Sequence, residues 1–385
     1  MDKRQGRCWA EIDLAAIHHN VGEIQKMIPA TTKIMGIVKA NAYGHGDIAI
    51  TQELIRCGID FFGVASMEEA LALRDAGIAE PILILGYTPP FQFHYLHERN
   101  IIQTVISAAY GYELSAYAQA HDVKLHAHIK VDTGMCRLGI QCKVDRWDSD
   151  DVKAMYHLPH LCIDGIFSHF SVSDEYNKAA DVDFTRQQIH CFDALLEELK
   201  AAGIHPGLTH LQNSYGIINY PQLHYDYVRP GLLHLGVTSD NQLPTLRQPD
   251  FHPIMTWKAR VVYVKEINAD SSVSYGRHFT ASHPMRIATI SCGYADGYPR
   301  IASNQGQEVL IHKQRAKIIG NICMDQMMVD VSHIDAVKEG DEAVMFGYDQ
   351  EVCLPVDELS RICHTINNET LCRLSQRVVR VYRSS

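Results

Sequence analysis

Residues 33–46 of this 385-residue chain read KIMGIVKANAYGHG. The apolar run that ends at Val38 predicts a short buried strand, and Lys39 follows at its carboxyl end. In an α/β barrel, that end of each strand presents catalytic side chains. Burial there lowers the pKa of a lysine, and a neutral lysine forms a Schiff base with an aldehyde cofactor or serves as a general base. The alternative is a surface lysine that ends a strand.

The surrounding sequence alternates between apolar, β-rich runs and helical patterns. The strand-like runs are 34–38, 61–64, 82–85, 125–131, 165–168, 210–211 and 228–236. Segments 14–27, 48–57, 67–75 and 184–202 carry apolar residues every three to four positions, as amphipathic helices do. About eight such units fit an α/β fold in which residues 1–243 form a (β/α)8 TIM-like barrel.

From about residue 240 the pattern changes to short alternating strands with turn residues between them. These predicted strands are 256–264, 284–291, 307–311, 317–322 and 342–346, and a further strand is expected at 8–12. The polar stretch 239–253 contains prolines and reads as a linker, with the border near Pro244. We therefore expect residues 244–385 to form a C-terminal, mostly-β domain.

Composition narrows the class of protein. The formal net charge is −10, and no long basic run offsets it, which argues against a nucleic-acid partner and favours small-molecule chemistry. Eleven cysteines without a CxxC pair indicate reduced thiols in a cytoplasmic protein. The N-terminus carries no signal-peptide pattern, and the apolar runs are shorter than the roughly 20 residues that span a bilayer. No metal site is expected.

Several motifs are similar, in the same order, to those of the alanine racemase family. Residues 38–46 resemble its pyridoxal-phosphate attachment motif, in which the lysine carries the cofactor. Further matches are WAEIDL (9–14), KVDTGMCRLG (130–139), VRPG (228–231), SYGR (274–277), GYADGYPR (293–300) and CMDQ (323–326). The resemblance implies an amino-acid racemase that uses pyridoxal 5′-phosphate and works as a homodimer with shared active sites.

Racemisation sets its own requirements. The α-proton of an amino acid is a very weak acid, so the carbanion must be delocalised into an electron sink such as pyridoxal phosphate. Two bases must lie on opposite faces of the planar intermediate, because a single base would return the proton with retention. By resemblance, Lys39 serves the D-antipode, and Tyr275 from the partner subunit serves the L-antipode. A phenol with a pKa of about 10 needs neighbouring cations to act near neutral pH.

The resemblance implies that His169 and Arg229 help Tyr275 to act as a base near neutral pH. Arg229 faces the pyridine nitrogen in the family, and His169 bridges the arginine and the tyrosine. A guanidinium keeps its proton, so the nitrogen stays largely unprotonated, which discourages transamination. By position alone, a histidine among 22 is more often a surface or core residue, and a strand-end arginine can belong to a surface ion pair.

Other positions receive binding roles from the resemblance. The further cofactor contacts are Tyr43, Leu85, Arg137, Asn213, Ser214, Gly231 and Leu232, with Tyr43, Ser214, Gly231 and Leu232 at the phosphate. Arg137 also binds the substrate carboxylate, and Lys130 matches a lysine that is carbamylated in some members and orients this arginine. Met324 covers the substrate carboxylate from the partner, although a buried methionine is otherwise a packing residue. The substrate corridor would include Asp174, Tyr294, Arg300 and Ile366.

Three residues depart from the family pattern. Asn321 stands where the corridor usually has arginine, Val379 replaces a common proline, and Asn368 replaces a tyrosine in the active site. A short amide with donor and acceptor capacity leaves room for a β-hydroxyl and can hydrogen-bond it. The pattern resembles the VanT-type serine/alanine racemase branch, associated with vancomycin resistance. Activity on both serine and alanine is therefore expected, and the branch implies an N-terminal membrane domain outside this chain, which would then be the cytoplasmic domain of a membrane protein.

Three other interpretations stay open. A housekeeping alanine racemase keeps the fold and mechanism, with Asn368 incidental. A fold-related decarboxylase of basic amino acids has no place for Tyr275 or for residues 323–326. A non-catalytic pyridoxal-phosphate-binding protein built on a single barrel would leave the residues after about Pro244 unexplained.

Overall fold

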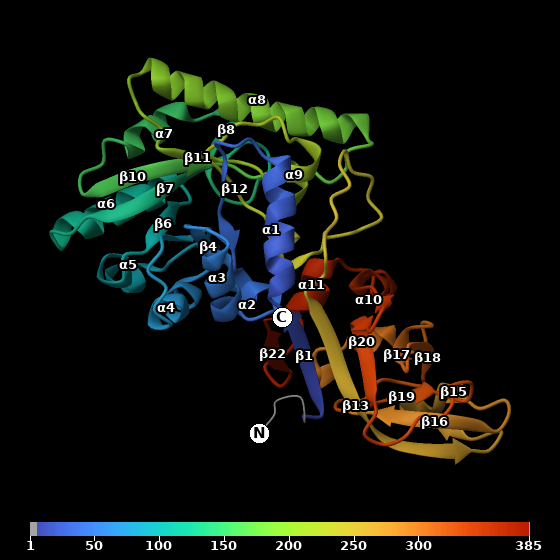
Figure 1. The fold of residues 1–385 in the computed structure, drawn as a ribbon. Coiled ribbons are helices and arrows are strands. Elements are labelled where there is room, and N and C mark those ends of the chain that lie inside the picture. Colours follow the sequence, from blue (N-terminus) through green and yellow to red (C-terminus); the bar gives the residue numbers. More distant parts are fainter. Residues whose placement is uncertain (1–5, 385) are drawn as a thin grey trace.

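A ring of short parallel strands forms the centre of the first lobe in the computed structural model, which describes residues 6–384 (Figure 1). The order around the ring is β2 (Lys33–Ile34), β12 (Tyr227–Val228), β11 (Leu208–His210), β10 (Leu161–Phe167), β7 (Leu125–Asp132), β6 (Ile102–Val105), β5 (Ile82–Ile84), β4 (Phe62–Val64) and β3 (Gly36–Ile37). Because β2 and β3 are one strand interrupted at Met35, the ring closes with eight strands within the described residues. The predicted barrel is confirmed.

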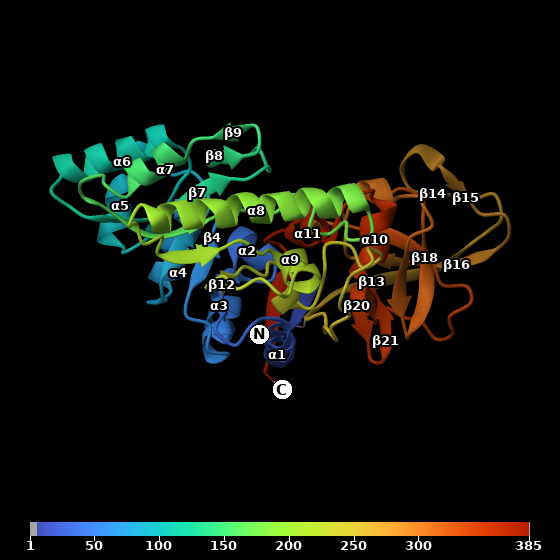
Figure 2. The same cartoon turned by 90° about the horizontal axis from the view of Figure 1, so that it is seen from above.

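Helices surround this ring and pack apolar faces against it. They are α1 (Ala15–Met27), α3 (Asp47–Arg56), α4 (Met67–Asp75), α5 (Phe93–Glu98), α6 (Ala108–Ala120), α7 (Ser149–Met155), α8 (Ala179–Ala201) and α9 (Ser214–Asn219). The long helix α8 crosses one side of the barrel (Figure 2). The four predicted helices are present, and α8 begins five residues earlier than expected.

Two strand predictions need correction. The run 228–236 is a strand only at β12, because Pro230 lacks the N–H that a ladder needs, and a 3₁₀ turn follows at Leu233–Leu235. Strand β6 was missed because Gln103 and Thr104 interrupt its apolar pattern. Both are buried and satisfied: the Thr104 hydroxyl donates to the Ile84 carbonyl (2.6 Å), and Gln103 Nε2 donates to the Gly86 carbonyl (2.8 Å). The short pair β8 (Ile140–Lys143) and β9 (Arg146–Trp147) was also missed.

The second lobe is a sheet of nine strands among the described residues. Their order is β21 (Val352–Leu354), β20 (Glu342–Asp349), β17 (Glu308–Ile311), β18 (Gln314–Ile319), β19 (Met327–Asp330), β16 (Met285–Ile290), β13 (Met255–Ile267), β1 (Cys8–Asp13) and β22 (Val379–Arg383). The short pair β14 (Ser272–Val273) and β15 (Phe279–Thr280) and the small helices α10 (Val356–Ile362) and α11 (Asn367–Cys372) complete it. The predicted mostly-β domain is present.

Strand β1 departs from the predicted division at residue 243. It pairs antiparallel with β13, where Trp9 is opposite Lys258, and parallel with β22, where Trp9 is opposite Val379. The N-terminal strand therefore belongs to the sheet of the second lobe. Local periodicity predicts a strand but not its partner, so this crossing between the lobes was not predictable from the sequence.

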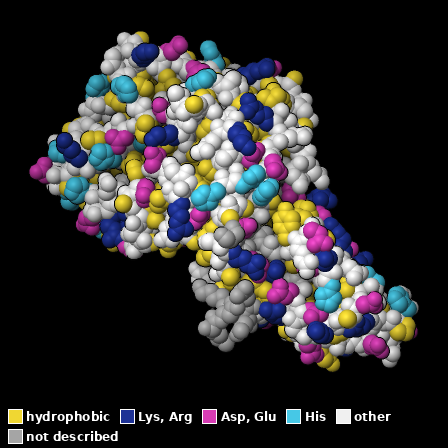
Figure 3. Space-filling view, in the orientation of Figure 1, with side chains coloured by type: hydrophobic (Ala, Val, Ile, Leu, Met, Phe, Trp, Pro, Cys, Tyr) yellow, Lys and Arg dark blue, Asp and Glu magenta, His cyan; other side chains and the backbone are white. Residues whose placement is uncertain are grey.

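Charged side chains of both signs are interspersed over the face shown in Figure 3. Within residues 6–384, none of the helices is both long enough and apolar enough to cross a bilayer. All eleven cysteines are free thiols.

Candidate active site

Lys39 lies two residues after the end of β3 and lines a cavity of about 520 Å³ where the barrel strands end. The cavity is also lined by Tyr43, Leu85, Lys130, Arg137, His169, Asn213, Ser214, Arg229, Gly231, Ile366 and Asn368. Burial lowers the pKa of the Lys39 amine, and the neighbouring Arg137 lowers it further. The structure thus gathers residues from 39 to 368 around one amine whose pKa is lowered.

The chain after Lys39 makes a left-handed turn. Ala40, Asn41, Ala42 and Tyr43 all have positive φ, between 47° and 55°. For residues with a Cβ this conformation costs roughly 1–2 kcal/mol each, so the turn must be held by its surroundings. It places the Tyr43 hydroxyl at Gly231, where a Cβ would lie 2.6 Å from that oxygen.

A cradle for a phosphate forms at this point. The Gly231 N–H donates to the Ser214 hydroxyl oxygen (3.1 Å), and the Tyr43 hydroxyl lies beside both. The Asn213 side chain caps helix α9 instead, accepting from the Gly216 N–H (2.9 Å) and from the Ser173 hydroxyl (2.9 Å). The buried Leu232 does not line the cavity, so its predicted phosphate contact stays a prediction.

Arg229 is buried and holds two histidines. Its Nη1 donates to His210 Nδ1 (2.7 Å), and its Nη2 lies 3.2 Å from His169 Nδ1 and donates to the Ser168 carbonyl (2.7 Å). A guanidinium only donates, so both Nδ1 atoms accept, and each neutral ring carries its proton on Nε2. Burial, reinforced by Arg229, lowers the pKa of both histidines, which keeps them neutral.

The hydrogen-bonded chain extends one residue deeper. His210 Nε2 lies 2.9 Å from His128 Nδ1, and the tautomer of His210 makes His210 the donor. His128 Nε2 has no partner within the described residues. Sequence reasoning missed His210 and His128, because nothing in a chain with 22 histidines distinguishes them before the barrel brings them to Arg229.

Lys130 is buried without an acidic partner. Its Nζ lies 4.5 Å from the centre of the Phe167 ring, and it makes no hydrogen bond or ion pair within residues 6–384. Burial, followed by Arg229 and Arg137, lowers its pKa well below the ordinary value. A neutral amine beside two guanidinium groups is the state that this site favours.

Asn368 reaches the cavity from α11 of the second lobe. Its Oδ1 is buried and has no hydrogen-bond partner within the described chain. The preceding residue, Asn367, is bonded on all sides, donating to the Thr238 carbonyl (3.0 Å) and to Asp357 Oδ1 (2.7 Å). The hydrogen bonds of Asn367 fix the start of α11, whereas the buried Asn368 carbonyl oxygen is left unpaired within the described chain.

Tyr275 and Met324 do not line this cavity. Both are exposed, by 70% and 53%, and they border a separate depression of about 410 Å³ with Ser274, Cys323, Asp325 and Gln326. Asn321 is buried behind them, and its Nδ2 donates to the Tyr275 carbonyl oxygen (2.7 Å). Its side chain is thus engaged with the backbone that carries Tyr275.

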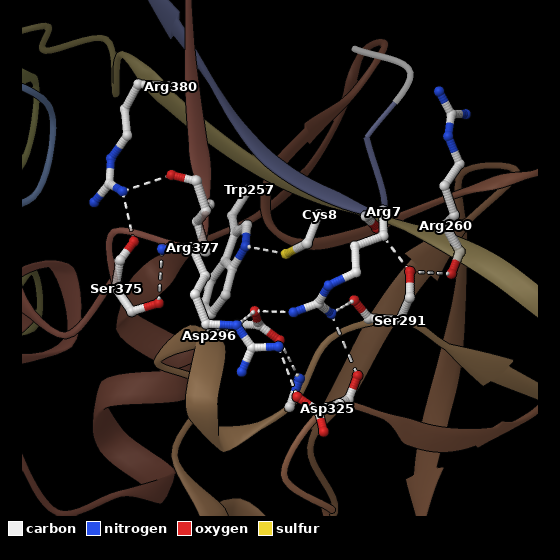
Figure 4. Close-up of polar contacts among 12 residues, drawn as sticks. Arg7, Cys8, Trp257, Arg260, Ser291, Asp296, Asp325, Ser375, Arg377 and Arg380 are labelled. Carbon is white, nitrogen blue, oxygen red and sulfur yellow. Dashed lines mark hydrogen bonds and ion pairs between the residues drawn. The ribbon is translucent and has the colours of Figure 1, made fainter. Parts of the chain in front are cut away.

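The segment that carries Met324 is anchored by a buried carboxylate. Arg7 and Arg377 converge on Asp296, which is fully buried, and Arg377 Nη2 also bonds Asp325 Oδ1 (2.6 Å) (Figure 4). Arg7 Nη1 donates to the Ser291 carbonyl (2.7 Å). Residues near both ends of the chain therefore fix the segment 323–326.

The predicted corridor residues are only partly brought together. Ile366 lines the Lys39 cavity and is half exposed, whereas Asp174 does not line it. Tyr294 and Arg300 lie exposed on the second lobe. Val379 lies on β22 opposite Trp9, so its backbone is part of the sheet, and its side chain is exposed.

Comparison with known proteins decides the family. The family model described as "Alanine racemase, N-terminal domain" matches residues 12–239, and that described as "Alanine racemase, C-terminal domain" matches residues 254–382. The chain belongs to the alanine racemase family. It is accordingly an amino-acid racemase that depends on pyridoxal 5′-phosphate, and membership of the alanine racemase family removes the decarboxylase and the single-barrel interpretations.

Similarity to individual proteins supports the same family. The alanine racemase of Desulforamulus reducens is 40% identical over 374 residues, covering 97% of this chain and 98% of the relative. The serine/alanine racemase of Enterococcus gallinarum is 37% identical over 372 residues, covering 97% of this chain and 51% of that longer protein. The solved alanine racemase of Clostridium difficile 630 has a TM-score of 0.90 at 32% identity, covering 98% of this chain and 96% of that one.

The residues of the cavity fit the cofactor. Lys39 offers a primary amine with a lowered pKa, Arg229 offers a buried guanidinium, and Gly231 leaves the space that a side chain would fill beside Tyr43. An aldehyde, a ring nitrogen and a phosphate each have a matching group here.

Proposed function

We propose that this chain racemises serine as well as alanine. The observation that carries the proposal is that Asn368 lines the Lys39 cavity while its buried Oδ1 has no hydrogen-bond partner among the described residues. A buried carbonyl oxygen without a partner costs about 1–3 kcal/mol, and a serine β-hydroxyl would donate to it. Alanine still fits, since water can satisfy the amide, so discrimination is modest. The likeness to the serine/alanine racemase of Enterococcus gallinarum supports the same substrates.

The two bases of this reaction are Lys39 and Tyr275. Lys39 Nζ moves the proton on one face of the substrate α-carbon, and the Tyr275 oxygen moves it on the other. Pyridoxal phosphate, when bound, delocalises the electron pair left on the α-carbon. His169, whose Nδ1 is held by Arg229, has its Nε2–H available for the phenolic oxygen.

The second base comes from another copy of the chain. Within this chain Tyr275 and Met324 border a depression separate from the Lys39 cavity, and both side chains are exposed. A homodimer in which each subunit lends these residues to its partner supplies bases to both faces. Arg137 would bind the substrate carboxylate, and the Met324 backbone N–H would cover it.

The products suit cell-wall synthesis. We propose that the D-amino acids enter peptidoglycan precursors in the cytoplasm, with D-serine serving vancomycin resistance. This setting is supported by the free thiols of all eleven cysteines and by the likeness to the enterococcal enzyme.

The test is kcat/KM for L-serine and L-alanine with pyridoxal phosphate supplied and the chirality of the product assayed. We expect comparable values for the two substrates. Asn368→Tyr should lower the serine to alanine ratio about tenfold, because one hydrogen bond to the substrate is lost. Asn268→Tyr, at an exposed turn of the second lobe, is the matched control and should leave the ratio unchanged.

The other outcomes are equally informative. Turnover of alanine with serine inert would identify a housekeeping alanine racemase. Cofactor binding without turnover of either amino acid would overturn the proposal that serine and alanine are the substrates.

A further inference from the structure

The Glu69 carboxylate joins two strand ends of the barrel. Its Oε1 accepts the Ala40 N–H (2.7 Å), directly after Lys39, and its Oε2 accepts the Ala65 N–H (2.7 Å), directly after β4. Ala65 itself lines the Lys39 cavity. One carboxylate therefore accepts backbone N–H groups from the segments that follow two neighbouring strands, β3 and β4.

The local sequence predicts a different use for this residue. Ser66 and Glu69 stand at the first and fourth positions of a capping box at the start of α4, in which the glutamate would accept the Ser66 N–H. Ser66 does cap the helix, since its hydroxyl accepts the Glu69 N–H (3.4 Å). The Glu69 side chain, however, reaches past Ser66 to Ala65 and Ala40. Helix capping alone does not explain that placement.

The turn that Glu69 contacts is the one that needs support. Residues 40–43 are all left-handed, a conformation that is unfavourable for side chains with a Cβ. The far end of the turn is held from the second lobe, where Arg380 Nε donates to the Gly44 carbonyl (2.8 Å) and the Tyr382 hydroxyl donates to the His45 carbonyl (3.1 Å). At the near end of the turn, the Glu69 carboxylate plays the corresponding role by accepting the Ala40 N–H.

Glu69 also stands out electrostatically. Besides burial, the groups that shift the pKa of the Lys39 amine are Arg137, Glu69, Cys372 and Arg229, and Glu69 is the carboxylate among them. A charged acceptor binds an N–H more strongly than a neutral one does. The same carboxylate thus acts electrostatically on the amine and holds the backbone next to the residue that carries it.

We propose that Glu69 is a positioning residue that fixes the left-handed turn after Lys39, and with it the Lys39 amine and the Tyr43 hydroxyl, by accepting the Ala40 and Ala65 N–H groups. This inference rests on the proposed roles of Lys39 and Tyr43 in holding the cofactor. Glu69 does not touch the reacting atoms; it acts through the backbone.

Hydrogen exchange of the holoenzyme tests the proposal without reference to activity. Glu69→Gln keeps the shape but replaces one accepting oxygen with an amide that only donates. We expect amide exchange in a peptide covering residues 36–46 to rise by about tenfold to a hundredfold, as the loss of a charged hydrogen bond predicts. The apparent Kd for pyridoxal phosphate, measured by titration of absorbance after dialysis, should weaken by about tenfold, and kcat should fall more than KM rises.

Two controls separate positioning from helix capping. Glu68→Gln changes the neighbouring carboxylate, which bonds Gln92 Nε2 (2.9 Å), and should leave exchange at 36–46 unchanged. Ser66→Ala should raise exchange only in a peptide covering 67–75. The proposal is overturned if Glu69→Gln raises exchange at 67–75 while 36–46 behaves as in the wild type. Absence of racemisation by the wild type would overturn the proposed function and leave this exchange result intact.

Discussion

Asn321 holds the backbone of Tyr275: its Nδ2 donates to the Tyr275 carbonyl oxygen over 2.7 Å. Asn304 Nδ2 in turn donates to Asn321 Oδ1 over 3.1 Å. Asn321 is buried, whereas the Tyr275 side chain is exposed, so the phenol that we propose as the second base is mounted on a fixed backbone. Asn321, which departs from the family pattern, thus positions the backbone of Tyr275, a candidate catalytic residue.

Asn321→Ala should therefore lower kcat/KM for both amino acids by roughly tenfold and destabilise the fold by about 1–2 kcal/mol, because the Tyr275 carbonyl loses its donor. Steady-state kinetics and urea unfolding measure the two effects. Asn304→Ala, which removes only the support of Asn321, should have the smaller effect. Activity of Asn321→Ala within twofold of the wild type would show that other contacts hold Tyr275.

Shared active sites predict complementation between inactive variants. Lys39→Ala and Tyr275→Phe should each abolish racemisation in pure form. When they are mixed and allowed to exchange subunits, half the dimers are mixed, and each holds one intact site. The mixture should recover about one quarter of wild-type activity. No recovery, despite subunit exchange shown by native mass spectrometry, would place both bases in one chain.

Lys130 should react with carbon dioxide. Its neutral amine attacks CO₂, an N–C bond forms, a proton is released to solvent, and the resulting carbamate anion faces Arg137 and Arg229, which now stabilise it. ¹³C NMR of protein equilibrated with labelled bicarbonate should show one carbamate carbon that is absent from Lys130→Ala. That variant should lose about tenfold in kcat/KM and regain part of it with added acetate. Lys143→Ala, near the surface, is the control.

The buried histidines predict sensitivity to acid. Burial lowers the pKa of His128 from its usual value to about 3, so the unfolded chain binds the proton more readily than the folded chain. The stability that this neutral histidine contributes is complete above pH 6.5 and is lost as the pH falls toward 3. At pH 4.5 the loss is roughly 2–3 kcal/mol.

Urea unfolding between pH 7.5 and 4.5 measures that loss. His128→Gln should show a shallower decline than the wild type, whereas His190→Gln, exposed on α8, should follow the wild type. Parallel declines for all three proteins would show that His128 is protonated in the fold.

Much of the site was predictable because its residues follow local patterns. Lys39 follows an apolar run, and Arg229 and Gly231 lie in one short motif, so position relative to a strand end already places them at one edge of the barrel. Lys130 and Arg137 share another motif. The residues that escaped prediction have no such signal: His210, His128 and Glu69 acquire their partners only when strands and helices distant in sequence are adjacent.

The sequence by itself determined the barrel, the following β domain, the family and the cluster around Lys39, because periodicity and motif order are properties of neighbouring residues. Only the tertiary structure decided that β1 joins the second sheet, that Glu69 holds the lysine turn, and that Asn368 Oδ1 has no partner among residues 6–384. Each of these features depends on contacts between residues that are distant in the sequence and on which buried polar groups those contacts satisfy. Local sequence patterns do not predict such contacts.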